Sequence, residues 1–217
     1  MSYIIGISGT HGVGKSTLIN GLKEQGVSIN EMSISRMAQK KFGYSTLTEA
    51  HSDPIKSFQF QQELLNLMYI RDYFIKFDGN HKNINFVVVE RTPLDLIAYA
   101  YLWDSKLGYN KKELETYVQT CINYLQNYYS GVINLHPHEN IKFEPDPNRG
   151  SLEYRYYIEE KINEYINDKI DFIDINSSDN ITRISQFLAF RNELKEKIKV
   201  ENEEIEQTLT SILKRIM

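Results

Sequence analysis

The chain has 217 residues, of which 41% are hydrophobic, and this favours a single folded domain over residues 1–217 with one substantial core. Its 25 basic and 29 acidic residues give a formal net charge of −4, so no overall positive charge attracts nucleic acid. The single cysteine excludes an intramolecular disulfide, and no stretch reaches the roughly 18 apolar residues of a membrane span. We therefore expect a soluble, cytoplasmic protein that enters its first strand without a signal peptide.

Apolar runs, helix caps and turn residues predict strands that alternate with helices. Asp53 and Pro54 illustrate these signals, since they form an N-cap followed by proline at the first helical position. In chain order, the predicted elements are a strand at 3–8, a helix at about 15–25, a strand at 27–32, helices at 33–42 and 54–77, a strand at 85–90, helices at about 92–103 and 111–129, a strand at 131–135, a helix at 151–168, a strand at 171–175 and a helical remainder.

Short β-branched strands that alternate with helices predict the α/β fold class. Such strands are buried on both faces, as in a mostly parallel sheet that is covered by helices on each side. The five predicted strands therefore indicate a three-layer α/β/α sandwich. Ligands of these folds bind beyond the carboxyl ends of the strands, so functional side chains are expected in the segments that follow each strand.

The segment after the first strand has the pattern of a phosphate-binding loop. Residues 9–16 fit G-x-x-x-x-G-K-[ST], between a buried strand and a helix. The glycines allow a bend that turns consecutive N–H groups toward one anion at the positive end of the helix dipole. Lys15 is expected to reach the β- and γ-phosphates, and the Ser16 hydroxyl to ligate Mg²⁺. The sequence thus predicts that a nucleoside triphosphate is bound by Gly9, Thr10, His11, Gly12, Val13, Gly14, Lys15, Ser16 and Thr17.

Two further strands are followed by acidic and basic residues. Glu90 and Arg91 follow the third strand, and Glu31 and Arg36 follow the second. A carboxylate in such a position holds Mg²⁺ or accepts a hydroxyl proton, and an arginine suits a bidentate phosphate contact. The alternative for each pair is a simple ion pair at a strand end. Which of the two glutamates is the base stays open.

Taken in order, these motifs resemble those of the P-loop nucleoside and nucleotide kinases. They are most similar to those of the phage and bacterial branch near thymidylate and deoxynucleoside kinases. The resemblance spans about residues 1–185, and the motifs that carry it are 9–16, Glu31, Arg36, 90–92 and 146–155. The resemblance implies a nucleotide-kinase-like fold. It also implies that Glu31 positions or deprotonates the acceptor, and that Arg91 contacts the acceptor.

A proline- and glycine-rich loop at about 136–152 precedes a predicted helix. It carries Arg149, and Arg155 lies just inside the helix. In the kinases that the chain resembles, this segment is a mobile lid whose arginines close over the transferring phosphoryl group. Phosphoryl transfer needs charge neutralisation and exclusion of water, and closure of such a loop provides both. The alternative is a surface loop with solvated arginines.

The predicted helix at 54–77 carries the candidates for acceptor binding. Helical spacing places Phe58, Gln61 and Gln62 on a similar face. Glutamine suits the edge of a nucleobase and an aromatic ring suits its face, and the kinases that the chain resembles read the base with a glutamine on this helix. Core packing with solvated glutamines is an equal alternative. Further candidates, which the sequence does not rank, are Tyr69, Arg71, Tyr99 and Tyr101.

Residues 194–217 extend beyond the kinase pattern as an additional helix. Their apolar side chains form one stripe with spacings of 7, 4, 3 and 4, at Ile198, Ile205, Leu209, Ile212 and Ile216. This stripe is expected either to pack back on the domain or to pair two copies of the chain as a homodimer.

The combined expectation is an ATP- and Mg²⁺-dependent phosphotransferase that moves the γ-phosphoryl group to a small nucleotide-type acceptor. A (deoxy)nucleoside monophosphate is preferred to a nucleoside because several arginines lie outside the donor site. Two alternatives stay open. One is a kinase that acts on a modified base of the 5-hydroxymethyluracil type in phage DNA, and the other is a nucleotide-gated regulatory ATPase.

Overall fold

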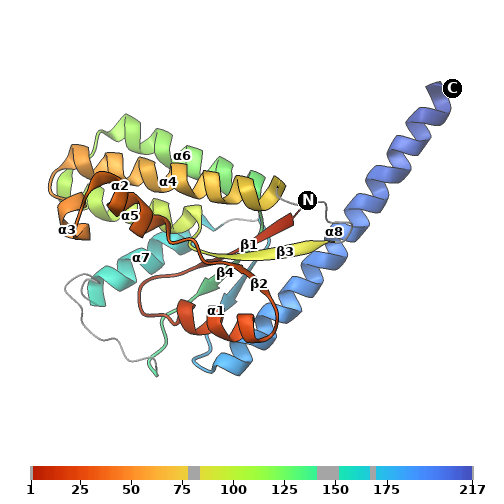
Figure 1. Cartoon of the computed structure of the whole chain (residues 1–217), viewed down its shortest axis with the longest axis horizontal. Coiled ribbons are helices and arrows are strands. Elements are labelled where there is room, and N and C mark those ends of the chain that lie inside the picture. The colour runs from red at the N-terminus through yellow and green to blue at the C-terminus, as the bar shows by residue number, and fades with distance from the viewer. Residues whose placement is uncertain (1, 78–83, 141–151, 167–169, 217) are drawn as a thin grey trace.

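The computed structural model describes residues 2–77, 84–140, 152–166 and 170–216, and its strands and helices alternate as predicted (Figure 1). The strands are β1 Ser2–Ser8, β2 Ser28–Asn30, β3 Asn85–Glu90, β4 Tyr129–Leu135 and β5 Phe172–Ile175. The helices are α1 Lys15–Glu24, α2 Ile34–Phe42, α3 Leu47–Ala50, α4 Pro54–Phe77, α5 Pro93–Leu107, α6 Lys111–Tyr128, α7 Leu152–Tyr165 and α8 Asn180–Ile216.

The five strands form one sheet in the order β2-β3-β1-β4-β5, and every strand pairing in the described part of the chain is parallel. The central strand β1 places Ile7 beside Glu90 of β3 and Ser8 beside Asn134 of β4. This register brings the carboxyl ends of the three strands to one edge of the sheet. The predicted α/β class with a five-stranded, mostly parallel sheet is confirmed.

Helices cover both faces of the sheet and bury two apolar cores. One core joins the sheet to α2, α4, α5, α6 and α7, and it includes Leu94 and Ile97. The other joins the sheet to α1 and α8, and it includes Leu18 and Phe187. Figure 1 shows α4, α5 and α6 on one side of the sheet and α1 and α8 on the other. The three-layer α/β/α sandwich is therefore confirmed.

Two local departures from the predicted elements have physical causes. β2 ends at Asn30 because the side chain of this residue accepts a hydrogen bond from Met32 N at 3.0 Å and turns the chain toward α2. The short helix α3 was not predicted, and it begins after Thr46, whose hydroxyl accepts a hydrogen bond from Glu49 N at 3.3 Å. Among the residues described, no helix combines the length and the apolar character of a membrane span.

α8 extends well past the sheet, and Figure 1 shows its C-terminal half projecting away from the other elements. Leu194 and Ile198 are 3% and 8% exposed and belong to the second core, whereas Ile205 and Leu209 are 56% and 55% exposed. The expected packing of the apolar stripe against the domain therefore ends at Ile198. Pairing of two copies through the rest of the stripe stays a prediction.

The two halves of α8 are expected to contribute unequally to stability. Replacing Leu194 with Ala removes buried apolar volume, so we expect a loss of about 2–5 kcal/mol in the free energy of unfolding, measured by urea denaturation. Leu209→Ala is the matched control and should change it by less than about 0.5 kcal/mol. A large loss of unfolding free energy for Leu209→Ala that depends on protein concentration would show that this half of α8 is buried between two copies of the chain.

Candidate functional site

The loop between β1 and α1 has the backbone of an anion-binding turn. Gly9, Gly12 and Gly14 have positive φ angles of 137°, 72° and 87°. A Cβ atom on Gly9 would lie 2.5 Å from the carbonyl oxygen of Leu135, and one on Gly14 would lie 2.5 Å from Nη1 of Arg183. Only glycine fits at these two positions, so the loop can lie against both β4 and α8.

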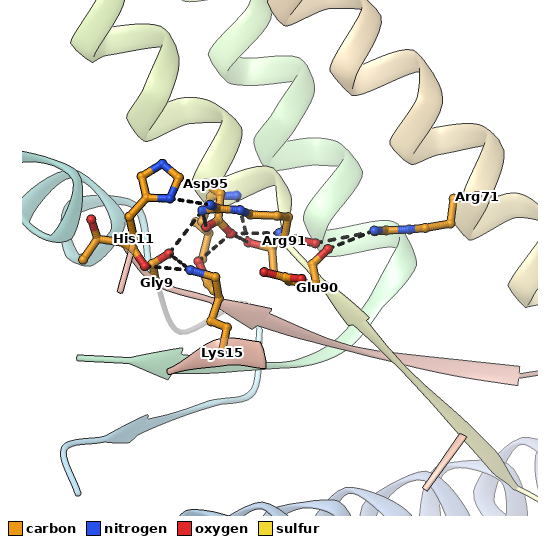
Figure 2. A network of polar contacts seen from close by, with 11 residues as sticks. Gly9, His11, Lys15, Arg71, Glu90, Arg91 and Asp95 are labelled. Carbon is orange, nitrogen blue, oxygen red and sulfur yellow. Dashed lines mark hydrogen bonds and ion pairs between the residues drawn. The ribbon is translucent and has the colours of Figure 1, made fainter. Parts of the chain in front are cut away.

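Lys15 begins α1 and turns its ammonium group back into this loop. Its Nζ donates to the carbonyl oxygens of Gly9 at 2.6 Å and of Thr10 at 2.7 Å (Figure 2). Burial, together with the nearby charge of Arg91, lowers the pKa of Lys15 from 10.5 to about 7. The Thr10 hydroxyl is buried and has no hydrogen-bond partner among the described residues. A buried cation and an unsatisfied hydroxyl in a turn of N–H groups suit an anion such as a phosphate.

Arg91 links this loop to the end of β3. It is the one non-glycine residue of the described chain with a positive φ, of 70°, and its backbone N–H donates to Ile7 O at 3.0 Å. Its Nη1 donates to Gly9 O at 3.2 Å and to Asp95 Oδ1 at 2.8 Å. Its Nη2 lies 3.4 Å from His11 Nδ1, as Figure 2 shows. The guanidinium group is therefore held against the phosphate loop from the β3 side.

Asp95 fixes Arg91 from the first turn of α5. Its Oδ2 accepts hydrogen bonds from Ser8 Oγ at 2.9 Å, from Thr92 N at 2.9 Å and from Thr92 Oγ1 at 3.2 Å. Both carboxylate oxygens are thus already in use, and the residue is fully buried, so Asp95 positions its neighbours rather than accepting a proton. This role was not predicted from the sequence, although Thr92 and Asp95 have the spacing of the capping box that they form.

A second buried ion pair supports the same turn from α4. Arg71 Nη1 donates to Glu90 O at 3.0 Å, and Nη2 lies 3.5 Å from Arg91 O (Figure 2). Arg71 Nε donates to Asp72 Oδ1 at 2.6 Å, and both side chains are 0% exposed. The Asp72 carboxylate also accepts hydrogen bonds, at 2.6 Å each, from the hydroxyls of Tyr124 and Tyr129. Arg71, which the sequence could not rank, is therefore a residue that fixes the backbone on both sides of Arg91.

Beside Arg91 lies a cavity of about 290 Å³, with walls from α2, α3, α4, α5 and α7. Gln61 lies in its wall with 1% exposure, and its Oε1 has no partner among the described residues. His51 and Trp103 are stacked in the wall with ring centroids 3.8 Å apart. Burial lowers the pKa of His51 to about 4, so this ring is neutral at pH 7. Stacked rings and a buried amide are features that suit a flat, polar-edged ligand.

The structure separates the three candidates that were expected to share one face of α4. Phe58 and Gln62 border a different hollow, where Phe58 packs on Tyr109 and Tyr117. Phe58 and Gln62 are four residues apart, so their directions on the helix differ by only about 40°. Gln61 is rotated by about 100° from Gln62 and therefore reaches a different hollow. The expectation of a common face is therefore wrong, and of the three only Gln61 lines the cavity beside Arg91.

The residues after β2 also lie apart from this cavity. Glu31 has a 69% exposed side chain and forms an ion pair with Lys23 of α1. Arg36 is exposed on α2, whereas Ile34 and Ser35 of the same helix line the cavity. The turn that Asn30 makes after β2 directs the Glu31 carboxylate toward α1, so the structure does not bring Glu31 and Arg36 together with Arg91.

The expected metal ligands follow β1 and end β3. Ser16 and Thr17 are exposed in the first turn of α1, and Glu90 is half-buried as the last residue of β3. The carboxylates of Glu90 and Asp95 both oppose the lowering of the Lys15 pKa, which places them near the ammonium group. Both oxygens of the Asp95 carboxylate already accept hydrogen bonds. The Ser16 hydroxyl and the Glu90 carboxylate are therefore the oxygen donors that fit Mg²⁺ here.

The lid prediction is only partly covered by the described residues, because Arg149 and residues 141–151 lie outside them. Arg155 is 3% exposed on α7, and its Nη2 lies 3.5 Å from Gly12 O of the phosphate loop. On the other side of the loop, Arg183 of α8 donates from Nη1 to Val13 O at 2.8 Å. Two arginines distant in sequence therefore contact the backbone of the phosphate loop.

Comparisons with known proteins support the fold. A family model described as AAA domain matches residues 4–183. No curated protein matches the sequence. Among solved structures, two of a deoxyadenosine kinase from M. mycoides are similar. The one with the products dCMP and a flexible dCDP has a TM-score of 0.59 at 19% identity, and the one with bound dATP has a TM-score of 0.58 at 20% identity.

Each comparison covers 88% of this chain and 99% of the M. mycoides chain. At such low identity the likeness establishes a shared fold. The nucleotide-kinase-like fold that the motifs implied is therefore confirmed.

The low pKa of Lys15 predicts that nucleotide binding takes up a proton. At pH 8 most of the free protein has a neutral Lys15, and the charge of a triphosphate raises its pKa again. Affinity for ATP should therefore fall as the pH rises from about 7 towards 10.5. Titration calorimetry at pH 8, in two buffers of different ionisation enthalpy, should show uptake approaching one proton. Equal uptake by Lys15→Met would contradict this assignment.

The buried pair of Arg71 and Asp72 is expected to be costly to break. Asp72→Asn leaves a buried guanidinium group without its countercharge, so the free energy of unfolding should fall by about 3–5 kcal/mol. Asp171, which pairs with Lys197 at the surface, provides the control, and Asp171→Asn should cost less than about 1 kcal/mol. Urea denaturation measures both, and equal small losses would show that the Arg71 pair does not hold the turn.

Proposed function

The chain belongs to the AAA domain family, and we propose that it is an ATP-dependent phosphotransferase acting on a deoxynucleoside monophosphate. The observation that carries the proposal is the position of Arg91. Its guanidinium group contacts Gly9 of the phosphate loop at 3.2 Å and also lines the cavity that contains Gln61. One cation thus joins a triphosphate-binding loop to a pocket for a second ligand, as transfer between two bound ligands requires.

ATP is the proposed donor. The phosphate loop, the buried ammonium of Lys15 and the unsatisfied Thr10 hydroxyl suit the triphosphate. Ser16 and Glu90 would hold Mg²⁺, which neutralises charge on the phosphates when it is bound. The M. mycoides kinase that shares this fold was solved with bound dATP, which supports a purine nucleoside triphosphate as a ligand of this fold.

A monophosphate is favoured as the acceptor because the described wall of the cavity has no carboxylate free to act as a base. Asp95 is its one acidic residue, and both oxygens of that carboxylate accept hydrogen bonds already. A sugar hydroxyl must lose a proton during transfer, whereas a phosphate oxygen is ionised from the start. Arg91, by contrast, suits an incoming phosphate. The M. mycoides kinase was solved with dCMP and dCDP as products, so it supports a deoxynucleoside-type ligand in this fold and does not distinguish a nucleoside acceptor from a monophosphate.

Gln61 is the residue that we propose reads the base of the acceptor. Its buried amide needs a partner, and a nucleobase edge supplies both donors and acceptors. The stacked rings of His51 and Trp103 give the base a flat apolar surface. A cavity of about 290 Å³ that is bordered by five helices favours a single nucleotide over a base within duplex DNA.

The proposal is tested by measuring ADP production with ATP and a panel of nucleosides, nucleoside monophosphates and DNA that contains modified bases. We expect turnover that requires a deoxynucleoside monophosphate and is lost in Lys15→Ala. Gln61→Leu should raise the KM for the acceptor by roughly tenfold or more, because a buried base edge loses its partner. Gln62→Leu is the matched control and should leave KM within about twofold.

Two outcomes would replace the proposal by another function. ATP hydrolysis that no acceptor accelerates would indicate a regulatory ATPase. Turnover that requires duplex DNA and falls steeply with salt would indicate the modified-base kinase.

A further inference from the structure

His11 belongs to the phosphate loop by sequence, yet its half-buried side chain lines the acceptor cavity. Its ring meets Tyr99 edge-on with centroids 5.5 Å apart. Figure 2 shows one ring nitrogen turned toward Arg91 and the other turned away from it. On the basis of the proposed function, we propose that the His11 imidazole is a neutral hydrogen-bond donor to the phosphoryl group as it passes between the two sites.

The contact with Arg91 determines which ring nitrogen carries the proton. A guanidinium group has donors only, so the 3.4 Å contact between Arg91 Nη2 and His11 Nδ1 requires Nδ1 to accept. The proton of the neutral ring is then on Nε2. His11 is thus held as the Nε2–H tautomer.

The reaction provides a place for this donor. During transfer, a bond forms between the acceptor phosphate oxygen and the γ-phosphorus, while the bond to the β,γ-bridging oxygen breaks and ADP leaves with the electron pair. Negative charge is carried by three non-bridging oxygens of the moving group. Lys15 belongs to the donor side and Arg91 to the acceptor side, and His11 contacts Arg91 from the donor loop. Its Nε2–H stabilises that charge and keeps its proton throughout.

This role is separate from that of the loop backbone. A substitution at position 11 keeps the backbone N–H group, so a side chain that only fills the loop could be exchanged for another ring without loss of catalysis. A side chain that donates in the transition state affects kcat instead, and leaves the affinity for ATP nearly unchanged.

The kinetic test compares His11→Phe, which keeps a ring without a donor, with His11→Gln, which keeps an N–H donor. We expect His11→Phe to lower kcat by about 10–100-fold with the KM for ATP within about threefold, and His11→Gln to recover most of the loss. Wild-type kcat in His11→Phe, or an effect on the KM for ATP alone, would overturn the inference. Absence of acceptor-dependent turnover in the unmodified protein would instead refute the proposed function.

A spectroscopic test does not depend on turnover. Long-range proton–nitrogen correlation spectra of the ¹⁵N-histidine-labelled protein report the tautomer of each of the five histidines, and the His11 signals are identified by their loss in His11→Gln. At pH 7 we expect the Nε2–H tautomer, and Arg91→Met should release it into a mixture. An Nδ1–H tautomer or an imidazolium at this position in the unmodified protein would contradict the inference.

Discussion

The ion pair between Arg91 and Asp95 is the interaction on which the rest of the site depends. β1 and β3 are neighbouring parallel strands, so the phosphate loop and the β3–α5 turn start from adjacent positions. Asp95 binds both, through Ser8 at the end of β1 and Arg91 after β3. Without this carboxylate, the guanidinium group would lose its countercharge and would keep only its contacts with the Gly9 carbonyl and His11. The anion-binding loop and the cavity would then lose their common wall.

Holding Arg91 in place is expensive for the fold. A left-handed backbone at a residue with a Cβ costs on the order of 1–3 kcal/mol, and burial of the Asp95 carboxylate adds a desolvation cost. Arg71 holds the strained turn, because it binds the carbonyl groups of Glu90 and Arg91 while Asp72 supplies its countercharge. Strain that is maintained by so many specific contacts is typical of a functional turn, since a glycine would have met the backbone requirement more cheaply.

Contiguous patterns made most of the fold and the phosphate loop predictable. A strand, a glycine turn and a helix are encoded within residues 3–25, and α4 begins at the predicted residue because its proline start is a local signal. Contacts between distant segments were not predictable in this way. Asp95 accepts a hydrogen bond from Ser8, which is 87 residues away in the sequence, and no local pattern near either residue predicts this contact. The sequence also could not distinguish Gln61 from Phe58 and Gln62, because which of them lines the cavity depends on the side of α4 on which the cavity lies.

The cations of the site also explain why donor and acceptor should bind as a pair. Burial, Arg91 and Arg155 all lower the pKa of Lys15, so the charged form of Lys15 is disfavoured in the free protein. An anion on the phosphate loop reduces the repulsion felt by Arg91, and an anion beside Arg91 reduces that felt by Lys15. We infer that each ligand favours binding of the other, because an anion at either position favours the protonated form of Lys15, which binds phosphate.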